Sequence, residues 1–211
     1  MRVTKFTHSC LRIEGDGAVL VVDPGAFSER AALTRADAVL ITHEHFDHLD
    51  VGGLADTLAQ RPGLRVYAHP DVLPKLTAFA DVVTVVQAGT EFAAAGFTVR
   101  AYGGQHAVIH PEIPRIANLG FLISDGVDSV YTPGDSFTIP DEHVDTLFVP
   151  LSAPWLKLSE AIDFVRGVKP GRAFALHDFL LTETGAQVSD GHLERLGGTR
   201  YARVAPGTTL D

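Results

Sequence analysis

The feature that most constrains how this chain can fold is a run of metal-binding side chains at the end of a predicted buried strand. Residues 38–41 (Ala-Val-Leu-Ile) form a short apolar stretch that is typical of such a strand. The next segment, 42–48 (Thr-His-Glu-His-Phe-Asp-His), places four potential ligands, the three imidazoles and the Asp47 carboxylate, within six residues. Imidazole suits zinc and other first-row metals, and a carboxylate adds an oxygen ligand. The pattern predicts a metal site at the end of a strand.

The distribution of histidine supports this interpretation. The chain has ten histidines, and four of them (His43, His45, His48 and His106) lie in or near stretches that contain Gly and Asp rather than on periodic faces. The alternative is a solvated polar loop that happens to be rich in histidine. We disfavour it because three histidines this close together would repel one another on protonation.

Composition narrows the class of protein. The 211 residues suffice for one well-buried core but not for two large domains, so we predict a single domain over 1–211. No apolar run approaches the roughly 20 residues that span a bilayer, and residues 1–8 lack the apolar stretch of a signal peptide. The single cysteine, Cys10, excludes an intrachain disulfide and fits a reducing compartment. We therefore expect a cytoplasmic protein that does not associate with membranes.

The charge of the chain argues against one class of partner. The formal net charge is −9, and no long basic cluster is present. Nucleic acids and anionic membranes attract clustered Lys and Arg. Binding to nucleic acid is therefore disfavoured, and we expect a small-molecule substrate.

The predicted elements form two β-rich halves that each include helices, which favours two packed sheets with helices outside. A hairpin signal at 14–17 and the absence of a linker or repeat agree with this arrangement. We predict strands at 3–6, 10–13, 18–22, 38–41, 65–68, 82–86, 91–94, 97–102, 119–123, 129–131, 147–150 and 172–176, and helices at 28–34, 53–60, 70–79, 159–168 and 190–196.

The run at 43–48 matches the His-x-His-x-Asp-His signature of the metallo-β-lactamase superfamily, and the chain resembles that superfamily from about 23 to 177. The resemblance implies an α/β (α+β) fold: a four-layer αββα sandwich of two mixed sheets with helices outside and a metal site at one edge. The other motif residues occur in the superfamily's order, namely Asp23, His106, Asp135 and His177.

The resemblance implies two divalent metal ions on five histidines and two aspartates, with Asp23 bracing the metal loop from behind. Two-metal hydrolases hold their ions about 3.5–4 Å apart, a distance that one carboxylate spans. Five imidazoles favour zinc, with manganese as the alternative. The implied ligands are His43, His45 and His106 for the first ion, Asp47, His48 and His177 for the second, and Asp135 bridging both.

The resemblance also implies a mechanism. The two ions lower the pKa of a shared water toward ~7, and the metal-bound hydroxide attacks a carbonyl carbon or phosphorus. Asp47 and Asp135 are thus predicted to be catalytic as well as ligands, with Asp47 orienting the nucleophile. His110, four residues after His106, is a candidate proton donor to the leaving group, and Arg115 is a candidate contact for an anionic group. The alternative for both is an exposed loop position.

Other residues narrow the subfamily. The segment 6–14 resembles the Gly-His-Ser start of the small ascorbate-6-phosphate-lactonase-like hydrolases, in which the early histidine lies near the metals. His8 is therefore a candidate pocket residue; the alternative is a strand-end histidine bonded to a backbone carbonyl. His45 argues against flavodiiron oxygen reductases, which usually carry a carboxylate there. Asp135 argues against the common class B β-lactamases, which carry cysteine. No insertion resembles the substrate arm of tRNA-processing nucleases.

We therefore predict a hydrolase that cleaves a small ester, lactone or phosphoester. One alternative is a phosphodiesterase or nuclease acting on a nucleotide or nucleic acid, although RNA would require a basic groove. A second is a non-hydrolytic metal-binding protein, whose site would be closed if it were structural. Substrate identity and homo-oligomer formation stay open. Trp155 and Phe179 are expected to pack in the core rather than to line a pocket.

Overall fold

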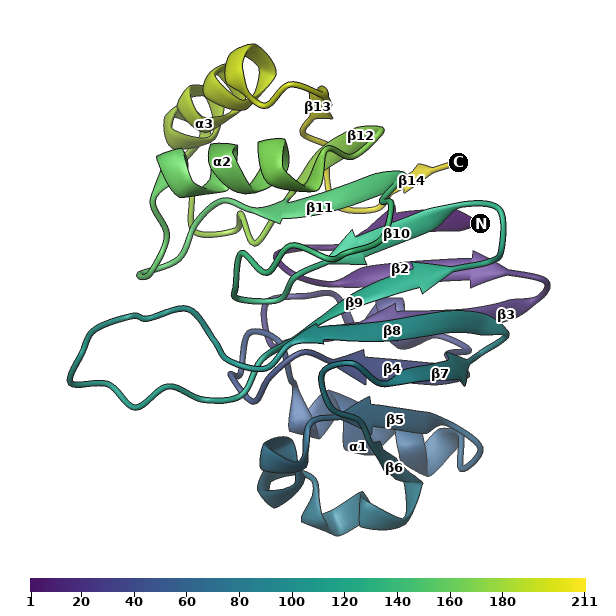
Figure 1. The fold of residues 1–211 in the computed structure, drawn as a ribbon. Coiled ribbons are helices and arrows are strands. Elements are labelled where there is room, and N and C mark those ends of the chain that lie inside the picture. The colour runs from purple at the N-terminus through teal and green to yellow at the C-terminus, as the bar shows by residue number, and fades with distance from the viewer.

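A computed structural model describes residues 1–211 and contains two seven-stranded sheets packed face to face (Figure 1). The first sheet is antiparallel from β14 to β3 and parallel from β3 to β6. Its strands, in spatial order, are β14 (Thr208–Leu210), β1 (Arg2–Lys5), β2 (Leu11–Gly15), β3 (Ala18–Val22), β4 (Ala38–Ile41), β5 (Arg65–Ala68) and β6 (Val83–Val85).

The second sheet is also mixed. It is antiparallel from β7 to β10 and parallel from β10 to β13. Its strands, in spatial order, are β13 (Arg200–Ala202), β12 (Arg172–Leu176), β11 (Thr146–Pro150), β10 (Ser129–Thr132), β9 (Leu119–Ser124), β8 (Phe97–Gly103) and β7 (Glu91–Ala94).

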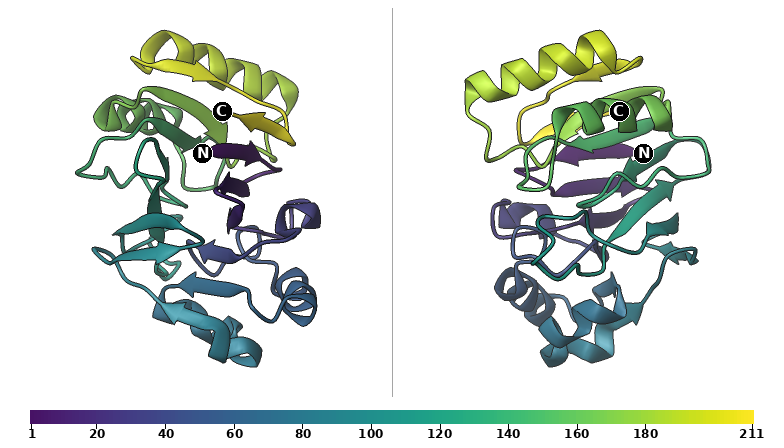
Figure 2. Two further views of the ribbon diagram at one scale, coloured as in Figure 1. Left: turned by 90° about the vertical axis from the view of Figure 1, so that its right-hand side faces the viewer. Right: turned by 60° about the vertical axis from the view of Figure 1, so that its left-hand side comes forward.

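Helices lie on the outer face of each sheet (Figure 2). Those on the first sheet are α1 (Val51–Gln60) and the short 3-10 helices η1 (Arg30–Leu33), η2 (Pro70–Lys75) and η3 (Thr77–Val82); those on the second are α2 (Leu158–Val168) and α3 (Glu183–Leu196). None of the helices has the length and apolar character needed to cross a bilayer. The layers confirm the predicted αββα sandwich.

Apolar side chains form a separate cluster at each interface between layers. Strand β4 shows how this arises, because Leu40 belongs to the cluster between the sheets while Val39 and Ile41 belong to the cluster under α1. Successive side chains of a strand point to opposite faces, so a strand covered on both faces is apolar throughout. The apolar run at 38–41 thus identified a central strand correctly.

Several predicted elements differ from the observed ones. The helix predicted at 28–34 is only the 3-10 turn η1, and that at 70–79 is split into η2 and η3. Pro74 lies inside η2 and Phe79 has non-helical torsion angles in η3, which prevents one continuous helix. Helix α3 begins well before 190, because Thr182 caps its first turn by accepting a hydrogen bond from Gly185 N at 3.2 Å. Strands β13 and β14 were not predicted.

The topology brings the motif residues to one edge of the sandwich. The metal loop 42–48 follows β4, and His106, Asp135 and His177 follow β8, β10 and β12. The strands β8, β10 and β12 run in the same direction, so their carboxyl ends share an edge. At that edge Leu119 N donates a hydrogen bond to Thr42 O at 2.9 Å, which joins the two sheets.

The packing of the core between the sheets leads to a prediction about the free energy of unfolding. Phe148 is fully buried there, with its ring centroid 5.7 Å from that of Phe174. We expect Phe148→Ala to lower the free energy of unfolding by about 3–5 kcal/mol, as measured by urea denaturation. Val127→Ala, at a side chain that is 86% exposed, is the control and should change it by less than about 0.5 kcal/mol. Equal effects for both variants would contradict this description of the core.

Candidate metal centre

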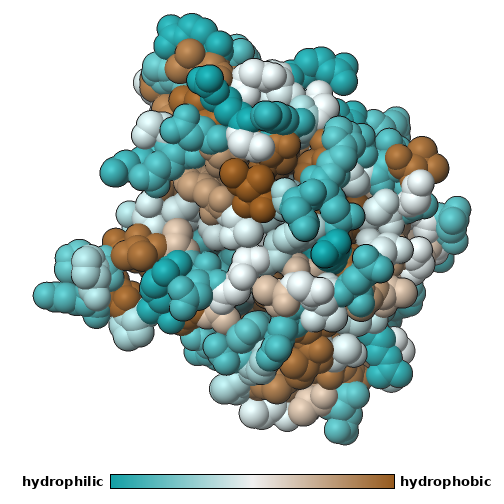
Figure 3. All heavy atoms as spheres, in the orientation of Figure 1, coloured by the Kyte–Doolittle hydropathy of each residue, from teal (hydrophilic) through white to brown (hydrophobic).

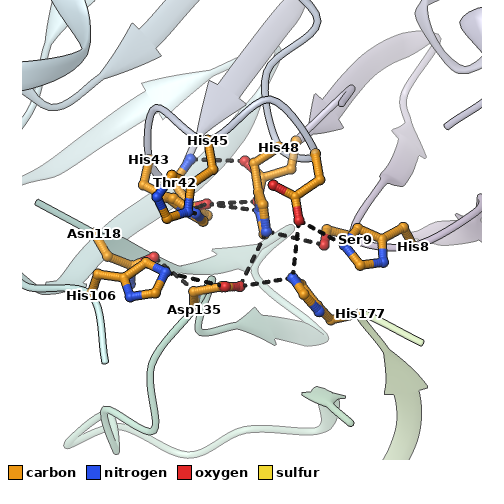
Figure 4. A network of polar contacts seen from close by, with 12 residues as sticks. His8, Ser9, Thr42, His43, His45, His48, His106, Asn118, Asp135 and His177 are labelled. Carbon is orange, nitrogen blue, oxygen red and sulfur yellow. Dashed lines mark hydrogen bonds and ion pairs between the residues drawn. The ribbon is translucent and has the colours of Figure 1, made fainter. Parts of the chain in front are cut away.

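All seven predicted ligands lie in two adjoining clusters of side chains. Figure 4 labels all of them except Asp47. In each cluster the candidate ligand atoms lie within 4.8 Å of one another. The first cluster consists of His43, His45, His106 and Asp135, and the second of His8, Asp47, His48 and His177.

Asp135 lies between the clusters with one carboxylate oxygen toward each. Its Oδ2 is 3.2 Å from His106 Nε2 in the first cluster. Its Oδ1 is 3.1 Å from His48 Nε2 and 3.2 Å from His177 Nε2 in the second. A carboxylate placed in this way has the geometry to bridge two cations.

Three histidines are held by hydrogen bonds on the side of the ring away from the clusters. His106 Nδ1 is 2.6 Å from Ala107 O, and His177 Nδ1 is 2.6 Å from Ser152 O. His48 Nδ1 is 2.7 Å from Asp23 Oδ2. Carbonyl and carboxylate oxygens only accept, so Nδ1 donates in each case and Nε2 faces the cluster. Such outer partners orient metal-binding imidazoles and fix their tautomer.

Three atoms at the centre of the site are buried without a hydrogen-bond partner: His106 Nε2, His177 Nε2 and Asp135 Oδ1. Buried polar atoms are almost always paired, so these atoms need a partner that is not a protein group. All are donors of electron pairs, and the surrounding set of imidazoles and carboxylates suits first-row divalent metals. The residues therefore fit the implied pair of metal ions.

Asp23 anchors the metal loop from behind. Its carboxylate accepts hydrogen bonds from Thr42 N at 2.8 Å and Thr42 Oγ1 at 2.7 Å, in addition to the contact with His48. Asp23 is 1% exposed, and its backbone has a φ of 47°, a left-handed conformation that is uncommon outside glycine. The Thr42 hydroxyl also contacts His43 Nδ1 at 3.0 Å, so one threonine connects Asp23 with both ends of the loop. Nothing in the sequence distinguished Thr42.

His8 belongs to the second cluster. Its Nε2 lies 3.1 Å from Asp47 Oδ2, and its ring centroid is 3.8 Å from that of His177. The alternative of a ring bonded to a backbone carbonyl was wrong. Burial lowers the pKa of His8, and the contact with Asp47 partly offsets this. Burial acts to raise the pKa of Asp47, but His177 and His8 outweigh it and hold that pKa below its usual range.

The buried charges of the clusters are coupled. Burial, followed by the proximity of His48, lowers the pKa of His43 well below its ordinary value, which favours the neutral form that binds metals. Burial opposes ionisation of Asp135, but His48 and His177 hold its pKa well below the usual range. Burial likewise opposes protonation of His48, but Asp135 and Asp23 raise its pKa well above the ordinary value. Metal binding by these groups would therefore release the proton that the contacts with Asp135 and Asp23 favour on His48.

Residues outside the motifs set the backbone of the site. Asn118 is fully buried; its Nδ2 donates to Pro133 O and its Oδ1 accepts from Asp135 N, both at 2.9 Å. A Cβ atom on Gly25 would lie 1.9 Å from Asp47 O, so any side chain there would displace the metal loop. No sequence signal indicates either role, because Asn118 is an isolated amide and Gly25 is an ordinary turn glycine.

The remaining predicted residues lie at the margin of the site. His110 is exposed, accepts a hydrogen bond from Glu112 N at 3.2 Å and belongs to neither cluster, so its role as proton donor stays a prediction. Arg115 is exposed, but its Nε donates to His106 O at 2.8 Å and braces a ligand backbone. Phe179 was expected in the core and is 55% exposed, because it follows His177 into the loop at the edge of the sandwich.

Comparisons with known proteins agree with this geometry. A family model described as the beta-lactamase superfamily domain matches residues 2–177. Protein Rv0786c of Mycobacterium tuberculosis is 40% identical over 204 residues, which cover 95% of each chain. A UPF0173 metal-dependent hydrolase of Carboxydothermus hydrogenoformans is 27% identical over 193 residues, or 84% of each chain. Among solved structures, Igni18, a metallo hydrolase from Ignicoccus hospitalis, has a TM-score of 0.77 at 20% identity and is matched over 99% of this chain and 97% of that one.

The chain therefore belongs to the metallo-β-lactamase superfamily. The structure of Igni18 shows that the fold is shared, and the Carboxydothermus relative is named as a metal-dependent hydrolase. Together with the two His/Asp clusters, these findings confirm the predicted class, a metal-dependent hydrolase.

The bracing role of Asp23 leads to a prediction about metal affinity. Asp23→Asn keeps the shape of the side chain but weakens its contacts with Thr42 and His48. We expect the affinity for zinc to fall by about 10–100-fold, the usual effect of losing an outer-shell partner. Equilibrium dialysis of metal-depleted protein measures this, with Asp56→Asn, at a side chain that is 66% exposed, as the control. Unchanged affinity in Asp23→Asn would contradict the bracing role.

Proposed function

We propose that this chain is a dinuclear metal-dependent hydrolase that cleaves a small ester or lactone. The observation that carries the proposal is the placement of Asp135, whose two oxygens lie 3.1–3.2 Å from imidazole nitrogens of two different clusters. A structural metal site would be closed around one ion, whereas a shared carboxylate is typical of two-metal catalytic sites. Five imidazoles favour zinc as the resident metal, with manganese as the alternative.

When bound, two divalent ions supply Lewis acidity and lower the pKa of water toward ~7. The residues of the chain provide the rest. One ion would be held by His43, His45 and His106, and the other by the second cluster. The side chain of Asp47 is 16% exposed, more than that of Asp135 or His177, so it is open to an incoming water molecule and orients it. Its contact with His8 keeps that carboxylate in place.

A group of three phenylalanines at the mouth of the second cluster supports an apolar substrate. The ring centroid of Phe27 lies 5.2 Å from that of His8, 5.3 Å from that of Phe46 and 5.0 Å from that of Phe179. Phe46 is 63% exposed and Phe179 is 55% exposed. Exposed aromatic rings next to a polar centre favour binding of an uncharged group. This favours an ester or lactone over a phosphodiester.

The long loop between β8 and β9 adds further apolar surface next to the site. It extends from the body of the molecule in Figure 1, and brown apolar atoms lie on it in Figure 3. Val108 and Ile113 in this loop are 49% and 47% exposed.

The position of His8 beside Asp47 also supports the lactonase-like resemblance of the N-terminal segment. We further propose a small-molecule substrate and, because a chain with a single cysteine has no intrachain disulfide, a reducing cytoplasmic location.

Removal of the shared carboxylate tests the proposal. We expect about two zinc ions per wild-type chain by elemental analysis. In a panel of lactones, carboxylic esters and phosphodiesters, we expect turnover of lactones or carboxylic esters. Asp135→Ala should lose metal and lower kcat/KM by more than about 100-fold, because outer-shell changes alone cost about 10–100-fold. Asp56→Ala, at an exposed position, is the control. Metal binding without turnover of any substrate would favour a non-hydrolytic protein, and turnover of phosphodiesters alone would favour the phosphodiesterase.

The phenylalanine group makes a prediction about specificity. Phe46→Ala and Phe179→Ala should each lower kcat/KM for a long-chain or aryl ester by about 10-fold, because partial loss of a buried aromatic contact costs about 1–2 kcal/mol. For an acetyl ester of the same leaving group we expect less than about a 2-fold change, because its acyl group is too short to contact the rings. Val127→Ala is the control. An equal loss on both esters would contradict a role in binding the acyl group.

A further inference from the structure

Trp155 makes a polar contact in addition to its packing contacts. It is the only tryptophan in the chain and lies in the segment between β11 and α2. Its ring is 8% exposed and packs edge-on against His106 and Phe137, with centroids 6.1 Å and 5.1 Å away. The indole Nε1–H donates a hydrogen bond to Asp135 Oδ2 at 2.9 Å. The expectation that Trp155 serves only core packing was therefore incomplete.

This hydrogen bond makes the two oxygens of the bridging carboxylate different. Oδ2 accepts from the indole N–H and lies on the side of His106. Oδ1 lies on the other side, 3.1 Å from His48 Nε2 and 3.2 Å from His177 Nε2. The backbone N–H of Asp135 donates to Asn118 Oδ1, which fixes the main chain but leaves the side chain free to rotate. Trp155 is the one group outside the candidate ligands that donates a hydrogen bond to the carboxylate.

We propose that Trp155 is a positioning residue that fixes the rotation of the Asp135 carboxylate, so that each oxygen faces one metal cluster. A hydrogen bond from a neutral donor to a charged acceptor is stronger than one between two neutral groups. In a buried site, water does not compete with it. The bond draws electron density from Oδ2, so the two clusters receive unequal carboxylate ligands. The inference uses Asp135 as the shared ligand of the proposed function, but it does not require that the chain hydrolyse any substrate.

The single tryptophan provides a direct readout. A cation bound by Asp135 neutralises a negative charge 2.9 Å from the indole nitrogen, and indole emission responds to nearby charge. We expect the emission of metal-depleted wild-type protein to change during titration with zinc, in proportion to the metal bound in parallel equilibrium dialysis. Binding of about two zinc ions per chain with unchanged emission would overturn the proposal.

Three variants separate positioning from packing. Trp155→Phe removes the N–H and should lower zinc affinity by about 10–100-fold. Trp155→His keeps a ring N–H and should recover most of that loss. Phe137→Leu reduces packing against the indole but keeps the N–H, and should change affinity by less than about 3-fold. Equal losses in Trp155→Phe and Phe137→Leu, or no recovery in Trp155→His, would reduce Trp155 to a packing role.

Circular dichroism of each metal-depleted variant checks that it is folded, and the wild-type titration decides the question if Trp155→Phe does not fold. The outcomes also separate this proposal from the proposed function. A chain that binds zinc with the expected tryptophan response but cleaves no substrate would refute the hydrolase and support the role of Trp155. Normal turnover with wild-type zinc affinity in Trp155→Phe would refute only the role of Trp155.

Discussion

The metal centre depends on two carboxylates that are buried among imidazoles. Asp23 and Asp135 are 1% and 4% exposed, and an isolated ionised carboxylate at such depth would be strongly destabilising. Asp23 is stabilised by Thr42 and His48, and Asp135 by three histidines, which in turn need its negative charge to remain close together. Asp23 anchors the metal loop from the first sheet, while Asp135 approaches from the second. The two sheets therefore complete one electrostatic unit that neither contains alone.

That unit is held in a strained backbone. His8, Asp23 and His177 all have positive φ angles, between 47° and 65°. Such conformations cost about 1–3 kcal/mol each and persist where the surrounding structure fixes them. Hydrogen bonds between elements do so here: His177 N donates to His8 O, and Asp23 N donates to Leu40 O, both at 3.0 Å. Backbone strain at these three residues, held in place by the hydrogen bonds between elements, is typical of a preorganised centre.

The sequence predicted the parts of the molecule that have a local signal. The apolar run of β4, the metal loop after it and the order of the motifs all follow from residues that lie close together in the chain. Thr42, Asn118 and Trp155 were not predicted to shape the site, because each is a single polar or aromatic residue whose partner lies on a different loop. Strands β13 and β14 were missed for a related reason: they are short and lie at sheet edges, and pairing rather than pattern defines them.

The pairing of β14 with β1 also bears on the order of events during folding. Val3 lies opposite Leu210 in this ladder, so one edge of the first sheet joins segments from opposite ends of the chain, as the two termini in Figure 1 illustrate. Contacts of such long sequence separation slow folding, since the loop must close before the contact stabilises it. Strand β1 leads directly to His8. The sheet edge that leads to the second cluster is thus completed by a segment far away along the chain, as the contact between the Thr4 and Thr209 hydroxyls illustrates, so a site that is local in space depends on a distant part of the sequence.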